Sequence, residues 1–322
     1  MYLLFVGVGA FVLSYLSVAA IRRWALRRNL LDIPNERSSH VVPTPRGGGL
    51  AIAAIVLIGF GIARLWAEDL ALSSFLGYML GALVVAAISA VDDLCGVSAP
   101  ARLLVHLFAA AIFVAFAGFV SRIYLPFLGE LEWGWLGVPI TLLWMVGLTN
   151  AYNFMDGIDG IAAGQAIVAG SLWIVVALAL GASALATLGV LIVGASWGFL
   201  LHNTPPARIF MGDVGSTVLG YTFAALPVLA FLQTGDSRLF LVGILCVAPF
   251  VFDPTVTMVR RAIQRENILQ AHRSHLYQRL VRRGQPHGQV SLLYTALALC
   301  CAWLFSGDED ETSRLEVLSP QS

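Results

Sequence analysis

The sequence contains no lysine, and charged residues of all kinds make up only 12% of its 322 positions. Soluble domains average about a quarter charged residues, so this scarcity excludes an ordinary soluble globular protein. Hydrophobic residues make up 58% of the chain, and the mean hydropathy is +0.83. We therefore expect an all-α, polytopic integral membrane protein in a lipid bilayer, because long apolar segments cross bilayers as helices.

Cysteine is also scarce, with four residues in the chain. Three of them, Cys246, Cys300 and Cys301, lie in apolar segments, and Cys95 lies in a predicted loop. We interpret all four as packing residues in a reducing environment. This pattern excludes a disulfide framework, no cysteine spacing indicates a zinc site, and we expect no nucleic-acid partner.

The apolar residues are grouped into segments long enough to cross a bilayer, which takes about 20 residues per helix. Ten segments qualify, two of them short enough to leave a count of nine or eleven open: 2–22, 49–66, 74–91, 102–119, 136–153, 161–180, 183–201, 215–232, 239–258 and 290–305. The first segment is long and is followed by arginines, so we expect it to remain as a membrane helix. Residues 1–306 are expected to form one domain, and the acidic, polar tail 307–322 to be disordered.

The nineteen basic residues are all arginine, and their distribution predicts the orientation of the chain. With ten spans and the N-terminus outside, fifteen arginines fall on one side, and only Arg64, Arg122, Arg238 and Arg314 fall on the other. The positive-inside rule makes the crowded side cytoplasmic and places both termini outside. A basic cytoplasmic face suits anionic lipids or anionic substrates.

A polar stretch in the middle of the chain, 150–164, reads N-A-Y-N-F-M-D-G-I-D-G-I-A-A-G. Polar groups of this density at a membrane boundary are unfavourable unless they have a function. The side-chain oxygens of Asn153, Asp156 and Asp159 are ligands that Mg²⁺ or Mn²⁺ prefers, and Gly157 lets a ligand approach the backbone. We expect Asn150, Asp156, Gly157 and Asp159 to bind substrate. The alternative is a turn between helices with capping Asn and Asp residues.

Two adjacent carboxylates, Asp92 and Asp93, follow the third predicted span. Such a pair repels itself, so one member tends to be protonated unless a cation or an arginine lies close. The pair therefore indicates a metal site or a general base. The alternative is a solvated acidic pair, which is common on protein surfaces.

The first predicted cytoplasmic loop, 32–49, contains three prolines and ends in three glycines. Prolines at this density prevent a regular helix. The loop can therefore fold over a pocket and direct His40, Thr44 or Arg46 at a phosphate. The alternative is an ordinary basic loop beside a membrane span.

The fourth predicted cytoplasmic loop, 202–216, offers groups that suit a nucleotide. Phe210 can stack on a nucleobase, and Asn203 can hydrogen-bond one. Asp213 stands in the small-residue sequence G-D-V-G, which lets a metal ion or a phosphate come close. The alternative is a proline-ended helix followed by a capping Asp.

The fifth predicted cytoplasmic loop is the most basic and places His272, Arg273 and His275 on one short segment. These donors suit a pyrophosphate. His272 and His275 can also ligate a metal at this spacing, but the other candidate ligands are oxygen donors, so we favour phosphate; a basic helix on the membrane surface is the alternative. Asp253, within the ninth predicted span, is a functional candidate by its position, although Arg260 or Arg261 can neutralise it.

All of these motifs fall on one side of the membrane under the ten-span topology, and the outer loops carry nothing comparable. Independent capping or flanking roles would not segregate in this way. We therefore predict a single cytoplasmic-face site assembled from five loops.

The motifs V-D-D-L, N-A-Y-N-F-M-D-G-I-D-G-I-A-A-G, N-T-P-P-A-R-I-F-M-G-D-V-G-S and H-R-S-H-L-Y-Q together resemble the polytopic polyprenyl-phosphate N-acetylhexosamine-1-phosphate transferases of glycosyltransferase family 4. The resemblance covers about 32–278 and implies a Mg²⁺-dependent enzyme, with Mn²⁺ as an alternative, in the bacterial inner membrane. It implies transfer of a sugar phosphate from a UDP-N-acetylamino sugar to undecaprenyl phosphate, with release of UMP. It also implies that Asp213 is the metal ligand, that Asn153 assists it, and that Asp92 and Asp93 activate the lipid phosphate.

Departures from the family pattern narrow the expected substrate. The muramoyl-pentapeptide transferases of the family carry three successive histidines where this chain has His272, Arg273, Ser274 and His275, and a lysine where it has His40. The R-S-S-H and P-T-P-R-G-G-G patterns are more similar to the branch that initiates O-antigen or other surface polysaccharides. We therefore expect a GlcNAc, FucNAc or QuiNAc donor, and we leave a homodimer open.

Two chemical routes stay open, and two other protein classes are weighed: a secondary transporter, and a non-catalytic membrane scaffold, which would not require the Asp, Asn and Gly residues found here. Asp92 can remove a proton from the lipid phosphate, which then attacks in line, or it can attack first and form a covalent phosphosugar enzyme. A secondary transporter with ionisable residues along its pathway is the alternative class, but transporters place such residues near the bilayer midplane, often between inverted repeats. Here the carboxylates cluster at one interface and no repeat is evident.

Overall fold

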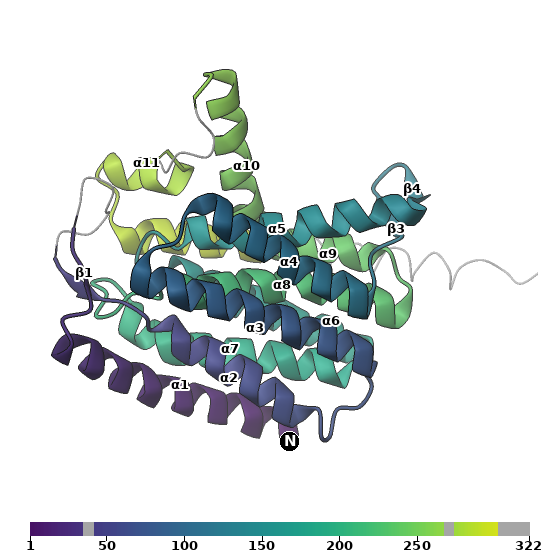
Figure 1. Ribbon diagram of the computed structural model, residues 1–322, viewed down its shortest axis with the longest axis horizontal. Helices are drawn as coiled ribbons and strands as arrows, with labels where there is room; N and C mark the ends of the chain where they lie inside the picture. Colours follow the sequence, from purple (N-terminus) through teal and green to yellow (C-terminus); the bar gives the residue numbers. More distant parts are fainter. Residues whose placement is uncertain (35–41, 267–273, 302–322) are drawn as a thin grey trace, which may run out of the picture.

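The computed structural model describes residues 1–34, 42–266 and 274–301, and this part of the chain is a bundle of long helices (Figure 1). Its helices are α1 (Tyr2–Arg27), α2 (Gly49–Ala63), α3 (Leu72–Cys95), α4 (Ala99–Ala117), α5 (Gly137–Met155), α6 (Ile161–Ala179), α7 (Ser183–Asn203), α8 (Asp213–Thr234), α9 (Arg238–Cys246), α10 (Ala248–Ile263), α11 (Leu276–Arg282) and a last helix, His287–Cys301. A 3₁₀ turn, Gly134–Leu136, precedes α5. The predicted all-α class is confirmed.

Strands are confined to two short antiparallel pairs. β1 (Leu31–Asp32) pairs with β2 (Thr44–Pro45), with Leu31 opposite Pro45. β3 (Arg122–Leu125) pairs with β4 (Gly129–Glu132), with Arg122 opposite Glu132. Both pairs lie in connections between helices, so they shape loops and do not build a sheet core.

The apolar segments predicted from the sequence are helical in the structure. Seven helices of the described chain are long and apolar enough to cross a membrane, and an eighth span is counted if α9 and α10 are taken together. Two shorter apolar helices, α2 and His287–Cys301, lie at two further predicted spans. This supports a multi-pass membrane protein.

The ninth predicted span, 239–258, is corrected by the structure: α9 and α10 meet at a bend of 78° and are not one straight helix. Pro249 follows the bend and has no N–H to donate to the preceding turn. The Cys246 carbonyl accepts a hydrogen bond of 2.8 Å from the buried Gln165 side chain. A backbone group at the break is thereby satisfied inside the protein, and α10 projects from the bundle (Figure 1).

The core is organised around α8, which is buried along its whole apolar length. It packs against α2, α3 and α5, while α7 packs between α1 and α6. The start of α8 lies close to the start of α2, because a Cβ on Gly49 would stand only 2.5 Å from the Cα of Gly215. Glycine at both positions therefore lets the two polar loops that precede these helices meet.

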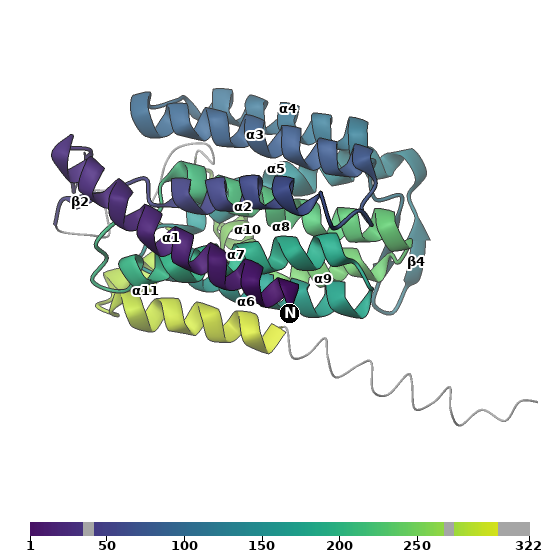
Figure 2. The same ribbon diagram turned by 90° about the horizontal axis from the view of Figure 1, so that it is seen from below.

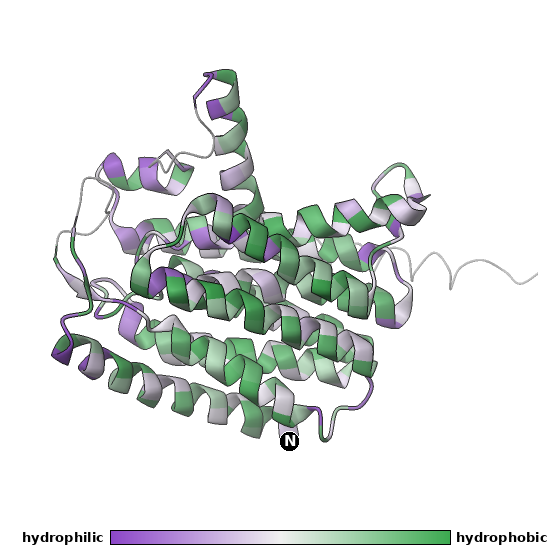
Figure 3. Ribbon diagram, in the orientation of Figure 1, coloured by the Kyte–Doolittle hydropathy of each residue, from purple (hydrophilic) through white to green (hydrophobic). Residues whose placement is uncertain are grey.

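The loops gather at the two ends of the bundle, where the hydrophilic residues also lie (Figure 3). One end carries β1, β2, α11 and the first residues of α8, and the other carries β3 and β4 (Figures 1 and 2). The N-terminus and the end of His287–Cys301 both point to the second end. The described parts of the motifs singled out in the sequence thus converge at the end opposite the described chain ends.

Candidate functional site

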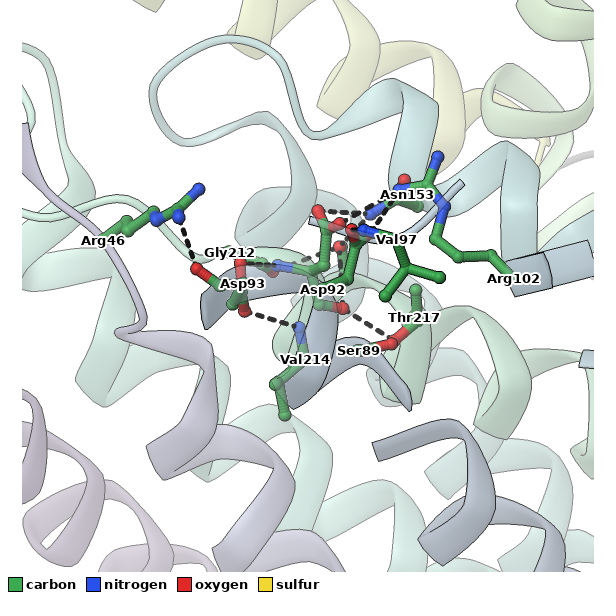
Figure 4. Close-up of polar contacts among 12 residues, drawn as sticks. Arg46, Ser89, Asp92, Asp93, Val97, Arg102, Asn153, Gly212, Val214 and Thr217 are labelled. Carbon is green, nitrogen blue, oxygen red and sulfur yellow. Dashed lines mark hydrogen bonds and ion pairs between the residues drawn. The ribbon is translucent and has the colours of Figure 1, made fainter. Parts of the chain in front are cut away.

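The first turn of α8 is fixed by a carboxylate from α3. Asp93 accepts hydrogen bonds from the backbone N–H of Asp213 at 3.1 Å and of Val214 at 3.3 Å. These N–H groups have no partner within their own helix, so Asp93 caps α8 from outside. The Arg46 guanidinium donates to the backbone carbonyl of Asp93 (Figure 4). The structure therefore gives Asp93 a role in positioning Asp213.

The neighbouring Asp92 belongs to a second arrangement, centred on Arg102 of α4. One guanidinium nitrogen of Arg102 lies 2.5 Å from Asp92 and 3.2 Å from Asp213 (Figure 4). The other Asp92 oxygen accepts a hydrogen bond of 2.6 Å from the N–H of Val97. Each of the adjacent acids thus has its own positive partner: Arg102 for Asp92, and the N-terminus of α8 for Asp93. Such partners offset the repulsion between two neighbouring carboxylates.

Asn153, at the end of α5, holds Asp213 from the opposite side. Its amide nitrogen donates to the Asp213 carboxylate at 3.0 Å and to the Ser216 hydroxyl at 2.9 Å. Asp213 is therefore oriented by Asn153 and Arg102 while its side chain keeps 31% exposure. An oriented, accessible carboxylate suits a cation.

The chain's own ligands do not enclose a metal ion: no group of three or more His, Cys, Asp or Glu side chains forms such a cage within 1–34, 42–266 and 274–301. Mg²⁺ is usually bound by one or two carboxylates together with water and substrate phosphates. Asp213 and the nearby Asn153 fit that pattern. They do not fit a closed structural metal site.

A further acid, Asp156, stands at the end of α5. Burial raises the pKa of its carboxyl to about 8, and the negative charges of Asp213, Asp93 and Asp159 add to the effect. An acid that burial and neighbouring negative charges keep protonated near neutral pH marks a place where a bound cation would be stabilised. The next residue, Gly157, has no room for a side chain, since a Cβ there would stand 2.0 Å from the Tyr277 hydroxyl.

Two buried polar residues join the loops around the site. The Asn203 side chain accepts a hydrogen bond of 2.8 Å from the Gly160 N–H and donates one of 2.9 Å to the Ile209 carbonyl. Asp159 accepts one of 3.1 Å from the Ala207 N–H. Both side chains hold the loop after α5 against the loop after α7. Their contacts favour bracing over the substrate binding that the sequence predicts for them.

The loop before α2 is attached to the same framework through its backbone. Phe210 donates its N–H to the Pro45 carbonyl at 2.8 Å and accepts one from Gly48 at 2.9 Å. These bonds place Arg46 and Phe210, both candidates from the sequence, beside the start of α8. His40, predicted in the same loop, lies outside the described residues.

The last polar loop is held by Asp253, which is only 1% exposed. Its carboxylate accepts hydrogen bonds from the Leu276 N–H at 2.8 Å, the Tyr277 N–H at 3.0 Å and the Tyr294 hydroxyl at 2.6 Å. His275, a predicted substrate-binding residue, lies 3.3 Å from the same carboxylate and is 4% exposed. These contacts make Asp253 an anchor for the loop.

The candidate residues thus fall into groups. The structure brings together Asp92, Asp93, Asn153, Asp156, Asp213 and Arg46. Asn150 lies one turn before Asn153 in α5, and its side chain donates to the Val146 carbonyl at 2.7 Å. His272, Arg273 and the tail 307–322 lie outside the described residues. Arg102 was missed, although an arginine ten residues after Asp92, at the start of an apolar span, was a readable signal.

Comparisons with known proteins indicate the family of the chain. The family model described as glycosyl transferase family 4 matches residues 75–231. A Bacillus subtilis (strain 168) protein, named as a probable undecaprenyl-phosphate N-acetylglucosaminyl 1-phosphate transferase, is 33% identical over 87% of this chain and 78% of its own length. The decaprenyl-phosphate N-acetylglucosaminephosphotransferase of Mycolicibacterium smegmatis is 32% identical over 89% of this chain and 77% of its own length.

A third relative comes from the branch that the sequence disfavours. The phospho-N-acetylmuramoyl-pentapeptide-transferase of Latilactobacillus sakei is 32% identical, but over 58% of this chain and 61% of its own length. The matched region of the family model runs from α3 to α8 and so includes Asp92, Asn153 and Asp213. The chain therefore belongs to glycosyl transferase family 4, as its motifs predicted.

Proposed function

We propose that this protein transfers an N-acetylhexosamine 1-phosphate from a UDP-sugar to a polyprenyl phosphate, releasing UMP. The observation that carries the proposal is the contact of Arg102 with both Asp92 and Asp213 at one end of a membrane bundle. Phosphoryl transfer needs positioned positive charge beside an attacking and a leaving oxygen, and this arrangement supplies it.

The acceptor we propose is undecaprenyl phosphate, and the first donor to test is UDP-GlcNAc. Two relatives that match most of the chain are named as N-acetylglucosamine phosphate transferases with undecaprenyl or decaprenyl phosphate. UDP-FucNAc and UDP-QuiNAc are the donors to test next. The product would begin an O-antigen or a related surface polysaccharide.

Asp213, with Asn153, would hold Mg²⁺, which when bound withdraws charge from the departing UMP. Both oxygens of Asp92 are hydrogen bonded, one to Val97 and one to Arg102. A turn of Arg102 from the carboxylates to the substrate phosphates would free an oxygen of Asp92 to accept a proton or to attack phosphorus. The direct and the covalent route share this step.

We also propose that the end carrying Asp213 faces the cytoplasm and that both termini lie outside. The asymmetric distribution of arginines supports this orientation, and UDP-sugars are cytoplasmic metabolites. A cysteine accessibility scan in intact cells, with reporters at Ser98 and at Phe127, tests it. Labelling of the Ser98 reporter by an impermeant reagent would contradict the orientation.

The decisive experiment measures UMP release by the purified protein in detergent, with undecaprenyl phosphate, Mg²⁺ and a panel of UDP-N-acetylhexosamines. We expect release with one donor, loss of release with a chelator, and recovery with Mg²⁺ or Mn²⁺. Asp213→Ala and Asp92→Asn should insert normally and abolish release. Wild-type turnover in both variants would contradict the site, and no release with any donor would favour the secondary transporter, which makes no UMP.

A further inference from the structure

His106 in α4 is a buried histidine, and within the described residues its ring makes no well-formed hydrogen bond. It is only 3% exposed, and neither ring nitrogen meets hydrogen-bond geometry with any residue of the described chain. Buried polar atoms are nearly always paired, so an unpaired one calls for a ligand or a water. The side chain of Asn150 lies beside the ring, and Arg102 and Asp92 are within electrostatic range of it.

The position of His106 relates it to the site described above. Arg102 and His106 are four residues apart in α4, so they share one face of that helix. Asn153 and Asn150 are three residues apart in α5, which packs against α4. Arg102 and Asn153 both contact Asp213. His106 and Asn150 therefore form a second polar level, one helical turn further into the bundle.

The depth of this level argues for a ligand that arrives from the membrane. His106 is seven residues from Ala99, where α4 begins, which is about 10 Å along the helix axis. The residues that follow Arg102 and His106 in α4, Leu103 and Leu107, are each 42% exposed and apolar, as expected of a lipid-facing surface. A water-soluble nucleotide binds from the aqueous side, at the helix ends. A lipid approaches from the bilayer, so its phosphate can contact residues that lie deeper in the bundle.

Resting on the proposed function, we propose that His106 and Asn150 bind the phosphate of the polyprenyl acceptor. The neutral imidazole presents one N–H donor, and phosphate oxygens are strong acceptors of such bonds. A phosphate between the two side chains would give the His106 ring the well-formed hydrogen bond that Asn150 alone does not provide. The pair thus selects a lipid that carries a phosphate monoester over the corresponding free alcohol.

The test compares the binding of undecaprenyl phosphate, undecaprenol, inorganic phosphate and UDP-GlcNAc to the purified protein, without turnover. In His106→Leu we expect affinity for undecaprenyl phosphate to fall by about 10- to 100-fold, the value of a hydrogen bond to a charged group. Affinity for undecaprenol and UDP-GlcNAc should not change. The melting temperature should stay the same or rise, because an unpaired polar group has been removed from the interior.

Two variants complete the design. His106→Gln keeps an N–H donor and should retain most of the affinity, and Asn150→Ala should show the same selective loss as His106→Leu. The matched control is Ser196→Ala in α7, which removes another buried side chain that lacks a partner among the described residues; it should leave affinity unchanged.

Three results overturn the inference: wild-type binding that does not distinguish undecaprenyl phosphate from undecaprenol, unchanged affinity in His106→Leu, or a loss that affects UDP-GlcNAc equally. If His106→Leu fails to fold, the selectivity of Asn150→Ala decides the question. Selective phosphate binding without any UMP release would refute the proposed function and leave the acceptor site standing.

Discussion

The guanidinium of Arg102 lies 3.2 Å from the carboxylate of Asp213. The protein therefore places a cation of its own beside the acid that is proposed to hold Mg²⁺. Because the same guanidinium nitrogen also contacts Asp92, its single positive charge reduces the repulsion between two acids in a region of reduced dielectric. Substrate phosphates and a metal ion would compete with this contact, which couples their binding to the release of Asp92.

Replacement of Arg102 tests this coupling. In Arg102→Gln we expect UMP release to fall by about 100-fold, since a charge aimed at the transferring phosphoryl group is lost. Mg²⁺ should bind the substrate-free variant as tightly as the wild type or more tightly, because Asp213 no longer pairs with an arginine. Arg102→Lys keeps the charge without the fork geometry and should lie between the two.

Calorimetric titration with Mg²⁺ and UMP assays check the two halves of this prediction. Arg122→Gln is the matched control, because Arg122 pairs with Glu130 at 2.9 Å near the opposite end of the bundle. Its exposed ion pair should matter little. Equal loss of Mg²⁺ binding and of turnover in Arg102→Gln would mean that the arginine supports the fold of the site and does not compete with the metal.

Gly157→Ala should damage the site by steric contact alone. The new Cβ would stand 2.0 Å from the Tyr277 hydroxyl, which donates a hydrogen bond of 2.9 Å to the Phe154 carbonyl. We expect a loss of about 1–3 kcal/mol of stability, the usual effect of overpacking, read as a lower melting temperature in detergent.

A matched control and a rescue sharpen this prediction. Gly147→Ala, within α5 and with nothing within 4 Å of the new Cβ, should be neutral or stabilising. The double variant Gly157→Ala/Tyr277→Phe should regain part of the lost stability, because the clashing oxygen is removed. A melting temperature of Gly157→Ala equal to that of Gly147→Ala would contradict the packing described here.

The sequence predicts that the polar loops meet at one side of the membrane. It does not predict the role of each residue in them. Span length and arginine distribution place Asp92, Asn153 and Asp213 on one side of the membrane. No periodic pattern reveals that Asp93 caps α8 while Asp92 faces Arg102. Adjacent residues on a helix point in different directions, and which direction meets the site depends on how the helices pack.

The contact between Asp253 and His275, which anchors the last polar loop, was not predictable for a related reason. Asp253 and His275 are 22 positions apart and become partners only because α10 bends away at Val247 and the chain returns. A straight ninth span would have left Asp253 facing its neighbours without these donors. Sequence patterns report the length of an apolar segment, but they do not reveal that Gln165, from a distant helix, donates a hydrogen bond to the carbonyl at the break.

Asp253→Ala should destabilise the protein more than any exposed acid does. It would leave the N–H groups of Leu276 and Tyr277 without their acceptor in a buried setting, at about 1–3 kcal/mol for each unsatisfied group. The control is Asp236→Ala, which removes an exposed partner of Arg238 and should change stability by less than about 1 kcal/mol.

Thermal denaturation in detergent compares these two variants, and a UMP assay with varied UDP-GlcNAc gives the functional effect. If the anchored loop contacts the donor, the KM for UDP-GlcNAc should rise in Asp253→Ala with little change in the KM for undecaprenyl phosphate. Equal melting temperatures for Asp253→Ala and Asp236→Ala would show that the loop does not depend on this carboxylate.

Asp156 should make the stability of the protein depend on pH. Its pKa is raised from 3.8 to about 8 in the folded protein. Between about pH 4 and about pH 8 the folded state keeps a proton that the unfolded chain has released, so the free energy of unfolding falls as the pH rises through this window. Below it both states are protonated and above it both are ionised, so Asp156 adds no further slope.

Asp156→Asn removes this dependence, because an amide cannot ionise. Melting temperatures measured in detergent with a chelator, between about pH 5 and about pH 8, should fall more steeply for the wild type than for the variant. The chelator matters because a bound divalent cation would favour the carboxylate and lower its pKa. Parallel curves for the two proteins would mean that Asp156 is ionised throughout this range, and the acid cluster around Asp213 would then need another source of positive charge.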